Sequence, residues 1–310
     1  MINLNRYCIS SMTPSRTFLN LVNICDNFRI DRPNDSSLFD AEELVPFTLT
    51  ASPQSPVIGL IRPAIIDQLS SDNERGSDKQ VPPVCEIRST EASKLRVSFA
   101  SWLKTPAERT NAMKVLCERW RDTGLFKDTI GPDKWRSEMY PVYRDPFGVH
   151  DNVAGEEIVD DNLNFAFEME RAAAALFGIV TYGVHMTIYH DSADGMKIWV
   201  PTRAETKQTY VHIRTSSCCP SMLTFWRGFD SRCVFSWPGY LDNSVAGGIP
   251  SGTPPFEAVV KESMEEANIT EDVVRKYAKA VGAVSYFTRW VLVLVAASVF
   301  MPDRLSAKNF

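Results

Sequence analysis

The second half of the chain carries its clearest strand-like pattern. Val180–Tyr189 and Met196–Val200 are rich in β-branched and aromatic residues, which predicts a pair of strands. The polar segment Asp191–Gly195 ends in glycine and predicts the turn between them. Trp290–Met301 is a run of twelve residues, apolar except for Ser298, and suits a buried strand or a short helix.

Helical spacing is expected in three other places. Thr105 precedes Pro106 and Glu108, which predicts a helix with Thr105 as N-cap and Pro106 at the first helical position. The apolar spacing of that helix continues to Gly124. The same period over Phe165–Phe177 predicts a second helix. A third helix is expected over residues 15–27.

The remaining segments divide the chain. Val57–Leu69 is apolar and predicts a strand followed by a helix. Ser70–Pro83 is polar and ends in prolines, so we expect a surface loop. The pattern changes near residue 180, where we place a boundary between two domains, at 15–180 and 181–310. Predicted helices and predicted strand segments both occur in the first domain, so an α+β class is expected.

Composition narrows the classes of function. The chain has 310 residues, of which 44% are apolar and 23% charged, as in globular enzymes and unlike collagens or disordered tails. Lysine and arginine number 33 against 38 acids, a net charge of −5. Because no basic stripe stands out, a nucleic acid duplex is not an expected partner. No apolar run is long enough to span a bilayer, so no membrane is expected.

The cysteines indicate a reducing compartment. There are seven, an odd number, with no Cys-x-x-Cys, and the four histidines complete no zinc pattern with them. Free thiols and a cytoplasmic location are therefore expected. The first 25 residues contain no acid and include Arg6 and Arg16, a transit-peptide feature that leaves a mitochondrial location open. The oligomeric state is open as well.

One stretch stands out chemically, at residues 247–269. A glycine-rich loop leads into a helix that opens at Pro254 and Pro255, with Thr253 as the expected N-cap. Three glutamates follow at positions i, i+3 and i+4, within about 100° of one helical face: Glu262, Glu265 and Glu266. Because adjacent carboxylates repel one another, we expect a cation there, and oxygen ligands favour Mg²⁺ or Mn²⁺. Asn268, which tolerates the left-handed conformation, is expected to end the helix.

This stretch resembles the Nudix box of the Nudix hydrolases. Gly247 stands at the first glycine of that pattern, and Lys261 stands at its arginine. The helical glutamates match Glu262, Glu265 and Glu266, and the final aliphatic position matches Ile269. Thr253 replaces an upstream glutamate, Ser263 an aliphatic residue and Asn268 a glycine. We expect Lys261 to pair with Glu257 one turn earlier.

Further segments narrow the resemblance to the thiamine-pyrophosphokinase-related Nudix subfamily of fungi and plants. They occur in the order that the relatives have, at residues 15–28, 138–143, 170–178, 183–186, 198–203 and 241–248. The resemblance implies a C-terminal Nudix α/β/α sandwich preceded by a mixed α+β domain. It also implies Mg²⁺-dependent cleavage of a small diphosphate, either an oxidised thiamine diphosphate analogue or an oxidised guanine nucleoside diphosphate.

The resemblance also assigns roles. Glu262, Glu265 and Glu266 would hold the metal with a carbonyl at Gly247, with Lys261 beside them, and either Glu265 or Glu266 would be the base. Arg203 and Lys207 are candidates for contact with the phosphates.

Two segments depart from the subfamily. Residues 211–237 intervene where the relatives continue almost directly, which we interpret as an unremoved intervening sequence, a gene-model error or a surface insertion. From residue 288 the tail is atypical, so the Nudix sheet is expected to be incomplete at its end. A non-catalytic or unstable remnant that at most binds a ligand is therefore the rival to an active enzyme.

Overall fold

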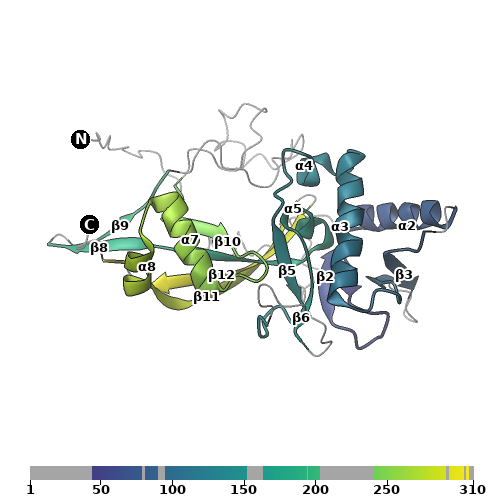
Figure 1. The fold of residues 1–310 in the computed structure, drawn as a ribbon, viewed down its shortest axis with the longest axis horizontal. Coiled ribbons are helices and arrows are strands. Elements are labelled where there is room, and N and C mark those ends of the chain that lie inside the picture. Colours follow the sequence, from purple (N-terminus) through teal and green to yellow (C-terminus); the bar gives the residue numbers. More distant parts are fainter. Residues whose placement is uncertain are drawn as a thin grey trace, which may run out of the picture.

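The computed structural model describes residues 44–78, 81–89, 95–151, 163–193, 195–202, 241–290, 293–303 and 305–306. The expected helix over residues 15–27, the segment 211–237 and both candidate phosphate contacts, Arg203 and Lys207, lie outside these residues. Helices and several sheets mix along the chain, as expected for the α+β class. Residues 44–179, the N-terminal part, and residues 180–306, the C-terminal part, lie side by side along the longest axis (Figure 1).

The N-terminal part is built on a four-stranded sheet of order β2-β1-β4-β3. Its strands are β1 (Val45–Thr48), β2 (Val57–Ile61), β3 (Cys85–Ser89) and β4 (Leu95–Phe99). Strands β1 and β4 pair in parallel, and the other neighbouring strands of this sheet pair antiparallel. Three helices pack with this sheet in the N-terminal part, α2 (Pro63–Asp78), α3 (Pro106–Asp122) and α4 (Lys127–Ile130).

A second, two-stranded sheet joins this part to the next. It contains β5 (Met139–Tyr143) and β6 (Phe165–Glu170), which pair antiparallel. One turn of helix, α5 (Arg171–Ala174), and a 3₁₀ turn, η1 (Ala175–Phe177), lead from β6 toward the C-terminal part. Because Tyr143 and Phe165 belong to the hydrophobic core of the C-terminal part, this sheet contributes to both cores.

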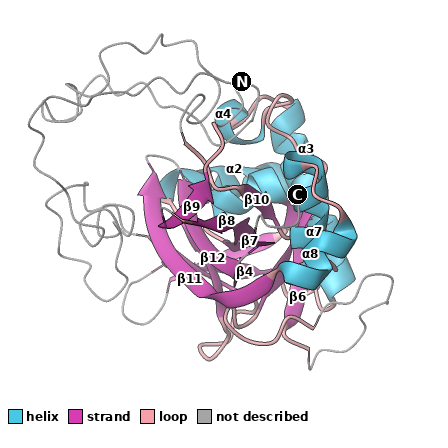
Figure 2. Ribbon diagram, turned by 90° about the vertical axis from the view of Figure 1, so that its left-hand side faces the viewer, coloured by secondary structure: helices cyan, strands magenta, loops and turns pink. Residues whose placement is uncertain are grey.

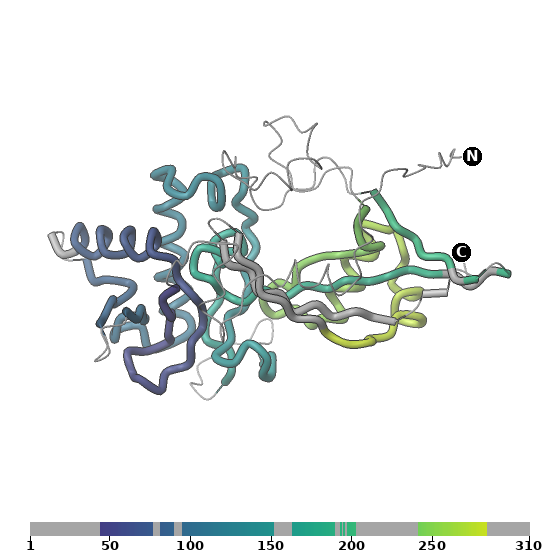
Figure 3. Tube along the Cα trace, turned by 180° about the vertical axis from the view of Figure 1, so that it is seen from behind, coloured from purple at the N-terminus to yellow at the C-terminus, as the bar shows by residue number. Residues whose placement is uncertain are grey.

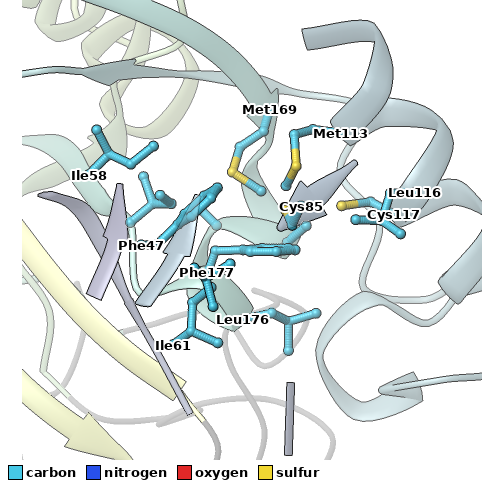
Figure 4. Close-up of a cluster of buried hydrophobic side chains, with 14 of the residues drawn as sticks. Phe47, Ile58, Ile61, Cys85, Met113, Leu116, Cys117, Met169, Leu176 and Phe177 are labelled. Atoms are coloured by element: carbon cyan, nitrogen blue, oxygen red, sulfur yellow. The ribbon is translucent and has the colours of Figure 1, made fainter. Parts of the chain in front are cut away.

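Aromatic rings fill the centre of the N-terminal core (Figure 4). Phe47 and Phe177 lie with ring centroids 5.9 Å apart, and Trp120 stacks on Phe177 at 5.6 Å with nearly parallel planes. Cys85 and Cys117 are fully buried free thiols in the same core, and burial raises the pKa of Cys85 to about 12. The expectation of free thiols is therefore confirmed for these two cysteines.

The C-terminal part contains a mixed four-stranded sheet of order β10-β7-β12-β11. Its strands are β7 (Val180–Met186), β10 (Val245–Gly248), β11 (Lys279–Trp290) and β12 (Val293–Asp303). The pairing of β12 with β7 is parallel, and the other two pairings are antiparallel. Two helices cover one face of this sheet, α7 (Pro255–Ala267) and α8 (Glu271–Tyr277) (Figure 2).

The atypical tail forms strands. β12 begins at Val293 and lies between β7 and β11, so the tail supplies an inner strand of the four-stranded sheet. A strand over the apolar run at 290–301 is therefore confirmed, although β11 reaches Trp290 and β12 starts three residues later. The tail also supplies β13 (Leu305–Ser306), which joins a small sheet with β8 (Ile188–Ser192) and β9 (Gly195–Trp199).

The strand pair expected over residues 180–200 is confirmed in part. β8 and β9 form an antiparallel hairpin in which Ser192 pairs with Gly195. The first predicted strand is divided at Thr187, however, and its first piece is β7 in the four-stranded sheet. Figure 3 shows β7 and then β8 running outward from the centre of the molecule.

The prediction of a single helix over Phe165–Phe177 is wrong. Its first six residues form β6, and only Arg171–Phe177 turns helically. Phe165, Ala166 and Phe167 are all buried. Because a segment buried on both sides shows no period-two alternation, its apolar spacing did not distinguish a strand from a helix.

The prediction of a surface loop over Ser70–Pro83 is also largely wrong, because α2 continues to Asp78. The carboxylate of Asp72 accepts hydrogen bonds from the Trp120 indole at 2.6 Å and from Arg119 at 2.8 Å. This contact fastens the polar second half of α2 to α3, which local sequence could not indicate. None of the helices among the described residues is long and apolar enough to cross a bilayer.

Truncating Trp120 should destabilise the protein more than any surface change on the same helix. We expect Trp120→Ala to lower the free energy of unfolding by about 3–5 kcal/mol, because it leaves a cavity beside Phe177. Val115→Ala on the exposed side of α3 should change it by less than about 0.5 kcal/mol. Urea unfolding measures both, and equal effects would contradict this description of the core.

Candidate functional site

Helix α7 ends where the sequence predicted. Asn268 adopts the left-handed conformation, with φ 54° and ψ 34°, and its backbone N–H donates to the carbonyl of Ser263. The next residue, Ile269, donates to the same carbonyl at 3.1 Å and buries its side chain. The reversal therefore satisfies the helix end and anchors the following segment in the core.

The start of α7 differs from the expectation. Its N-cap is Pro254, in an extended conformation, and not Thr253. The reason is local, because Pro255 is the first helical residue and a residue that precedes proline is driven out of the helical region. Thr253 lies one position too early to cap the helix, and its N–H donates to the carbonyl of Pro250 at 3.1 Å.

The glutamate face of α7 lies over strand β10. The half-buried side chain of Glu262 packs directly on Gly247, and a Cβ atom at Gly247 would overlap the Glu262 carboxylate. One turn later, Glu266 Oε2 accepts a hydrogen bond from the Ala246 N–H at 3.0 Å. The absence of a side chain at Gly247 therefore allows the helix to bring two carboxylates onto the strand.

The third glutamate and the lysine lie differently. Glu265 and Lys261 are exposed on α7. The expected pair of Lys261 with Glu257 is wrong, because Glu257 binds Arg275 of α8 through two hydrogen bonds of 2.9 and 2.7 Å. A planar guanidinium makes such a two-point contact and an ammonium does not. The contact lowers the pKa of Glu257.

Ser263, which replaces an aliphatic residue of the Nudix pattern, is fully buried. Its hydroxyl donates to the carbonyl of Val259 at 2.6 Å and lies 3.9 Å from the sulfur of Met186 in β7. Bonding back to its own helix satisfies the hydroxyl, so a serine fits the apolar position. The glutamate face is therefore held to the sheet despite this departure.

The residues present fit a hard divalent cation by donor type. Glu262 and Glu266 supply carboxylate oxygens at strand β10. Within the part of the chain that the structure describes, no three histidine, cysteine, aspartate or glutamate side chains form a metal-ligand group. A cation at this place would therefore bind mainly to two carboxylates, with Glu265 as a flanking charge.

Residues without a predicted role lie on the other side of the same strand. Gly248 packs against the hydroxyl end of Tyr140 and the guanidinium of Arg171. Glu138 binds Arg171 at 2.7 Å. The segments 138–143 and 170–178 had been distinguished only by their resemblance to relatives, and spacing along the chain gave no sign that they meet at the glycine pair.

A shallow hollow of about 340 Å³ lies at the N-terminal end of β10, away from the glycine pair. Trp199, Leu241 and Asn243 are among its lining residues, and none of the three α7 glutamates is. Asn243 Nδ2 lies 2.6 Å from His185 Nδ1. His185 of β7 therefore has a side-chain partner in the segment that leads into β10.

The chain has curated relatives over part of its length, although no family model matches it. Over 166 residues it is 38% identical to an uncharacterized protein of Saccharomyces cerevisiae, covering 52% of this chain and 35% of that protein. It is 34% identical to Nudix hydrolase 20, chloroplastic, of Arabidopsis thaliana, covering 61% of this chain and 38% of the relative. It is 32% identical to Nudix hydrolase 24, chloroplastic, of the same plant, covering 63% and 42%.

Nudix hydrolases are therefore among the sequence relatives of this chain, which spans less than half the length of each relative named. Among solved structures, the crystal structure of Caenorhabditis elegans Ap4A hydrolase overlaps 43% of this chain and 73% of its own. The identity is 13% and the TM-score 0.26. At that level the superposition adds nothing to the fold described above.

Substitutions at Asn268 should separate backbone strain from side-chain contacts. We expect Asn268→Ala to lower the free energy of unfolding by about 1–2 kcal/mol, because alanine is strained in the left-handed region. Asn268→Gly, which restores the residue of the Nudix pattern, should stay within about 0.5 kcal/mol of the parent. Thermal unfolding distinguishes the two, and an alanine variant as stable as the glycine variant would contradict the assigned conformation.

Proposed function

We propose that this chain is a Mg²⁺-dependent pyrophosphohydrolase of the Nudix type. The observation that carries the proposal is the packing of Glu262 and Glu266 of α7 on Gly247 and Ala246 of β10. The spacing along the sequence predicted that the α7 glutamates share one face of a helix. Two of them, Glu262 and Glu266, contact strand β10. The similarity to two Nudix hydrolases supports the same reaction class.

In this proposal Glu262 and Glu266 hold the cation with the backbone at Gly247, and Mn²⁺ can replace Mg²⁺. A bound Mg²⁺ would neutralise charge on the diphosphate and orient the phosphorus for in-line attack. Water adds to one phosphorus while the bridging P–O bond breaks, which leaves a monophosphate and inorganic phosphate. Glu265 or Glu266 accepts the proton of the attacking water.

The three proposed glutamates are not equivalent. The hydrogen bond from the Ala246 N–H fixes one oxygen of Glu266, so its other oxygen has a defined direction. Glu265 is exposed, as Glu266 is, but among the described residues it makes no hydrogen bond to β10. We therefore favour Glu266 for holding the cation and Glu265 for the proton. Lys261 is exposed one residue before Glu262 and adds positive charge to the rim of the site.

For the substrate, we propose a small diphosphate, either an oxidised thiamine diphosphate analogue or an oxidised guanine nucleoside diphosphate. Both present two adjacent phosphates, which match a cation held by carboxylates. We assign catalysis to residues 181–310 and keep 15–180 as a separate domain in the proposal. Arg203 and Lys207 remain proposed phosphate contacts.

Phosphate release should identify the reaction. We expect the purified chain with Mg²⁺ to release inorganic phosphate from oxothiamine diphosphate, from 8-oxo-dGDP, or from both. Glu265→Gln and Glu266→Gln should each lower kcat by about 10²–10⁴-fold, because one removes the proton acceptor and the other a cation ligand. Chelation of the metal should abolish turnover.

The matched control is Glu271→Gln. Glu271 is an exposed glutamate on the neighbouring helix α8, where it binds Arg275 at 2.7 Å, and its replacement should leave kcat unchanged. A folded chain that binds these diphosphates without releasing phosphate would favour the rival function, a non-catalytic binding protein. Turnover that survives in both Glu265→Gln and Glu266→Gln would refute the assigned site.

A methyl group at Gly247 should test the contact with the helix. Gly247→Ala places a Cβ where the Glu262 carboxylate lies, so the side chain must leave the strand. We expect kcat to fall by at least about tenfold, as when the support of a metal ligand is lost. Val115→Ala, at an exposed position of α3 outside this site, is the control and should keep the parent's kcat. Full activity of Gly247→Ala would show that this approach is unimportant.

A further inference from the structure

The loop that follows β10 is bonded to both parts of the molecule. The Ile249 N–H donates to the carbonyl of Tyr182 in β7 at 3.0 Å. Two residues later, the Ser251 N–H donates to the carbonyl of Met139 in β5 at 2.8 Å. The glycine-rich loop is therefore fixed on one side by its own sheet and on the other by the N-terminal part.

Gly248 packs closely against the N-terminal part. A Cβ built there would overlap the Tyr140 hydroxyl and would lie 3.2 Å from Cζ of Arg171. The guanidinium carbon of Arg171 lies 5.1 Å from the centroid of the Tyr140 ring, within the range of a cation–π contact. Arginine, ring and glycine backbone thus form one packed layer.

Arg171 is itself held in place by two contacts with Glu138. The Arg171 backbone N–H donates to the carbonyl of Glu138 at 2.8 Å, and Nη1 donates to its carboxylate at 2.7 Å. The two side chains keep 34% and 26% of their surface exposed. A charge-assisted pair of this exposure fixes the orientation of the guanidinium more than it adds stability.

Adjacent glycines in a strand present opposite faces. The open side of Gly247 faces Glu262, and the open side of Gly248 faces Tyr140 and Arg171. The glycine pair is therefore held from both sides, by α7 and by the start of α5. Any displacement of Gly248 also moves Gly247, together with the backbone oxygen and the carboxylate contact proposed to hold the cation.

We propose that Arg171 is a positioning residue for the carboxylate site, which the N-terminal part supplies to the C-terminal part. It acts through the backbone of Gly248, with Tyr140 as its platform and Glu138 as its anchor. This inference rests on the proposed function. It assigns the N-terminal part a task, which is to fix the glycine loop under the glutamates of α7.

The test compares Arg171→Ala and Glu138→Gln with the parent chain by two measurements. Amide hydrogen exchange of a peptide covering residues 246–252 reports on the Ile249 and Ser251 hydrogen bonds. We expect it to be about tenfold or more faster in both variants, because each loses a charge-assisted contact. Steady-state kinetics should show kcat lowered by about 10–100-fold with KM nearly unchanged, because the substrate does not touch Arg171.

Arg121→Ala is the matched control. The Arg121 guanidinium lies 4.4 Å from the centroid of the Trp135 ring, so this variant loses the same kind of contact elsewhere in the N-terminal part. We expect it to leave loop exchange and kcat as in the parent. Glu138→Gln is nearly isosteric and keeps the test valid if Arg171→Ala does not fold.

Unchanged loop exchange and kcat in both Arg171→Ala and Glu138→Gln would overturn the proposal. A raised KM with unchanged kcat would also overturn it, because Arg171 would then bind substrate directly. If the parent chain has no hydrolase activity, the proposed function fails. Faster loop exchange in the two variants but not in Arg121→Ala would still establish that Arg171 positions the loop.

Discussion

The carboxylate site depends on one close approach, in which strand β10 presents two glycines in succession. Helix α7 can lay Glu262 on Gly247 only because no side chain occupies that side of the strand. The next glycine gives the same access to Tyr140 on the other side. A larger residue at either position would separate layers that the carboxylate site needs in contact. The fold therefore places close packing on both sides of β10, where the proposed chemistry takes place.

Local features of the sequence predicted the parts of the fold that local chemistry determines. Thr105 caps α3 in a full capping box with Glu108, as the residue types and spacing indicated. Asn268 ends α7 in the left-handed conformation. The three glutamates lie on α7 at the spacing that predicted one helical face. Of the three, Glu262 and Glu266 contact β10. Each of these features is decided within one or two turns of chain.

Features that depend on distant contacts could not be predicted in the same way. Phe167 is buried within a strand, yet its spacing suggested a helix. Asp72 extends α2 through bonds to a helix more than forty residues away. Glu257 pairs with Arg275 of another helix and not with its neighbour Lys261. The meeting of Arg171 with Gly248 is of this kind, so the contribution of the N-terminal part emerges only in three dimensions.

Binding of Mn²⁺, followed by electron paramagnetic resonance, tests the proposed metal site without a substrate. We expect the parent chain to bind one Mn²⁺ per molecule and Glu262→Gln to weaken this binding by at least about tenfold. Glu257→Gln, which changes a carboxylate bound to Arg275 on the same helix, should leave it unchanged. Equal Mn²⁺ affinity in the parent and in Glu262→Gln would contradict the account, because the carboxylates on β10 would then not form the metal site.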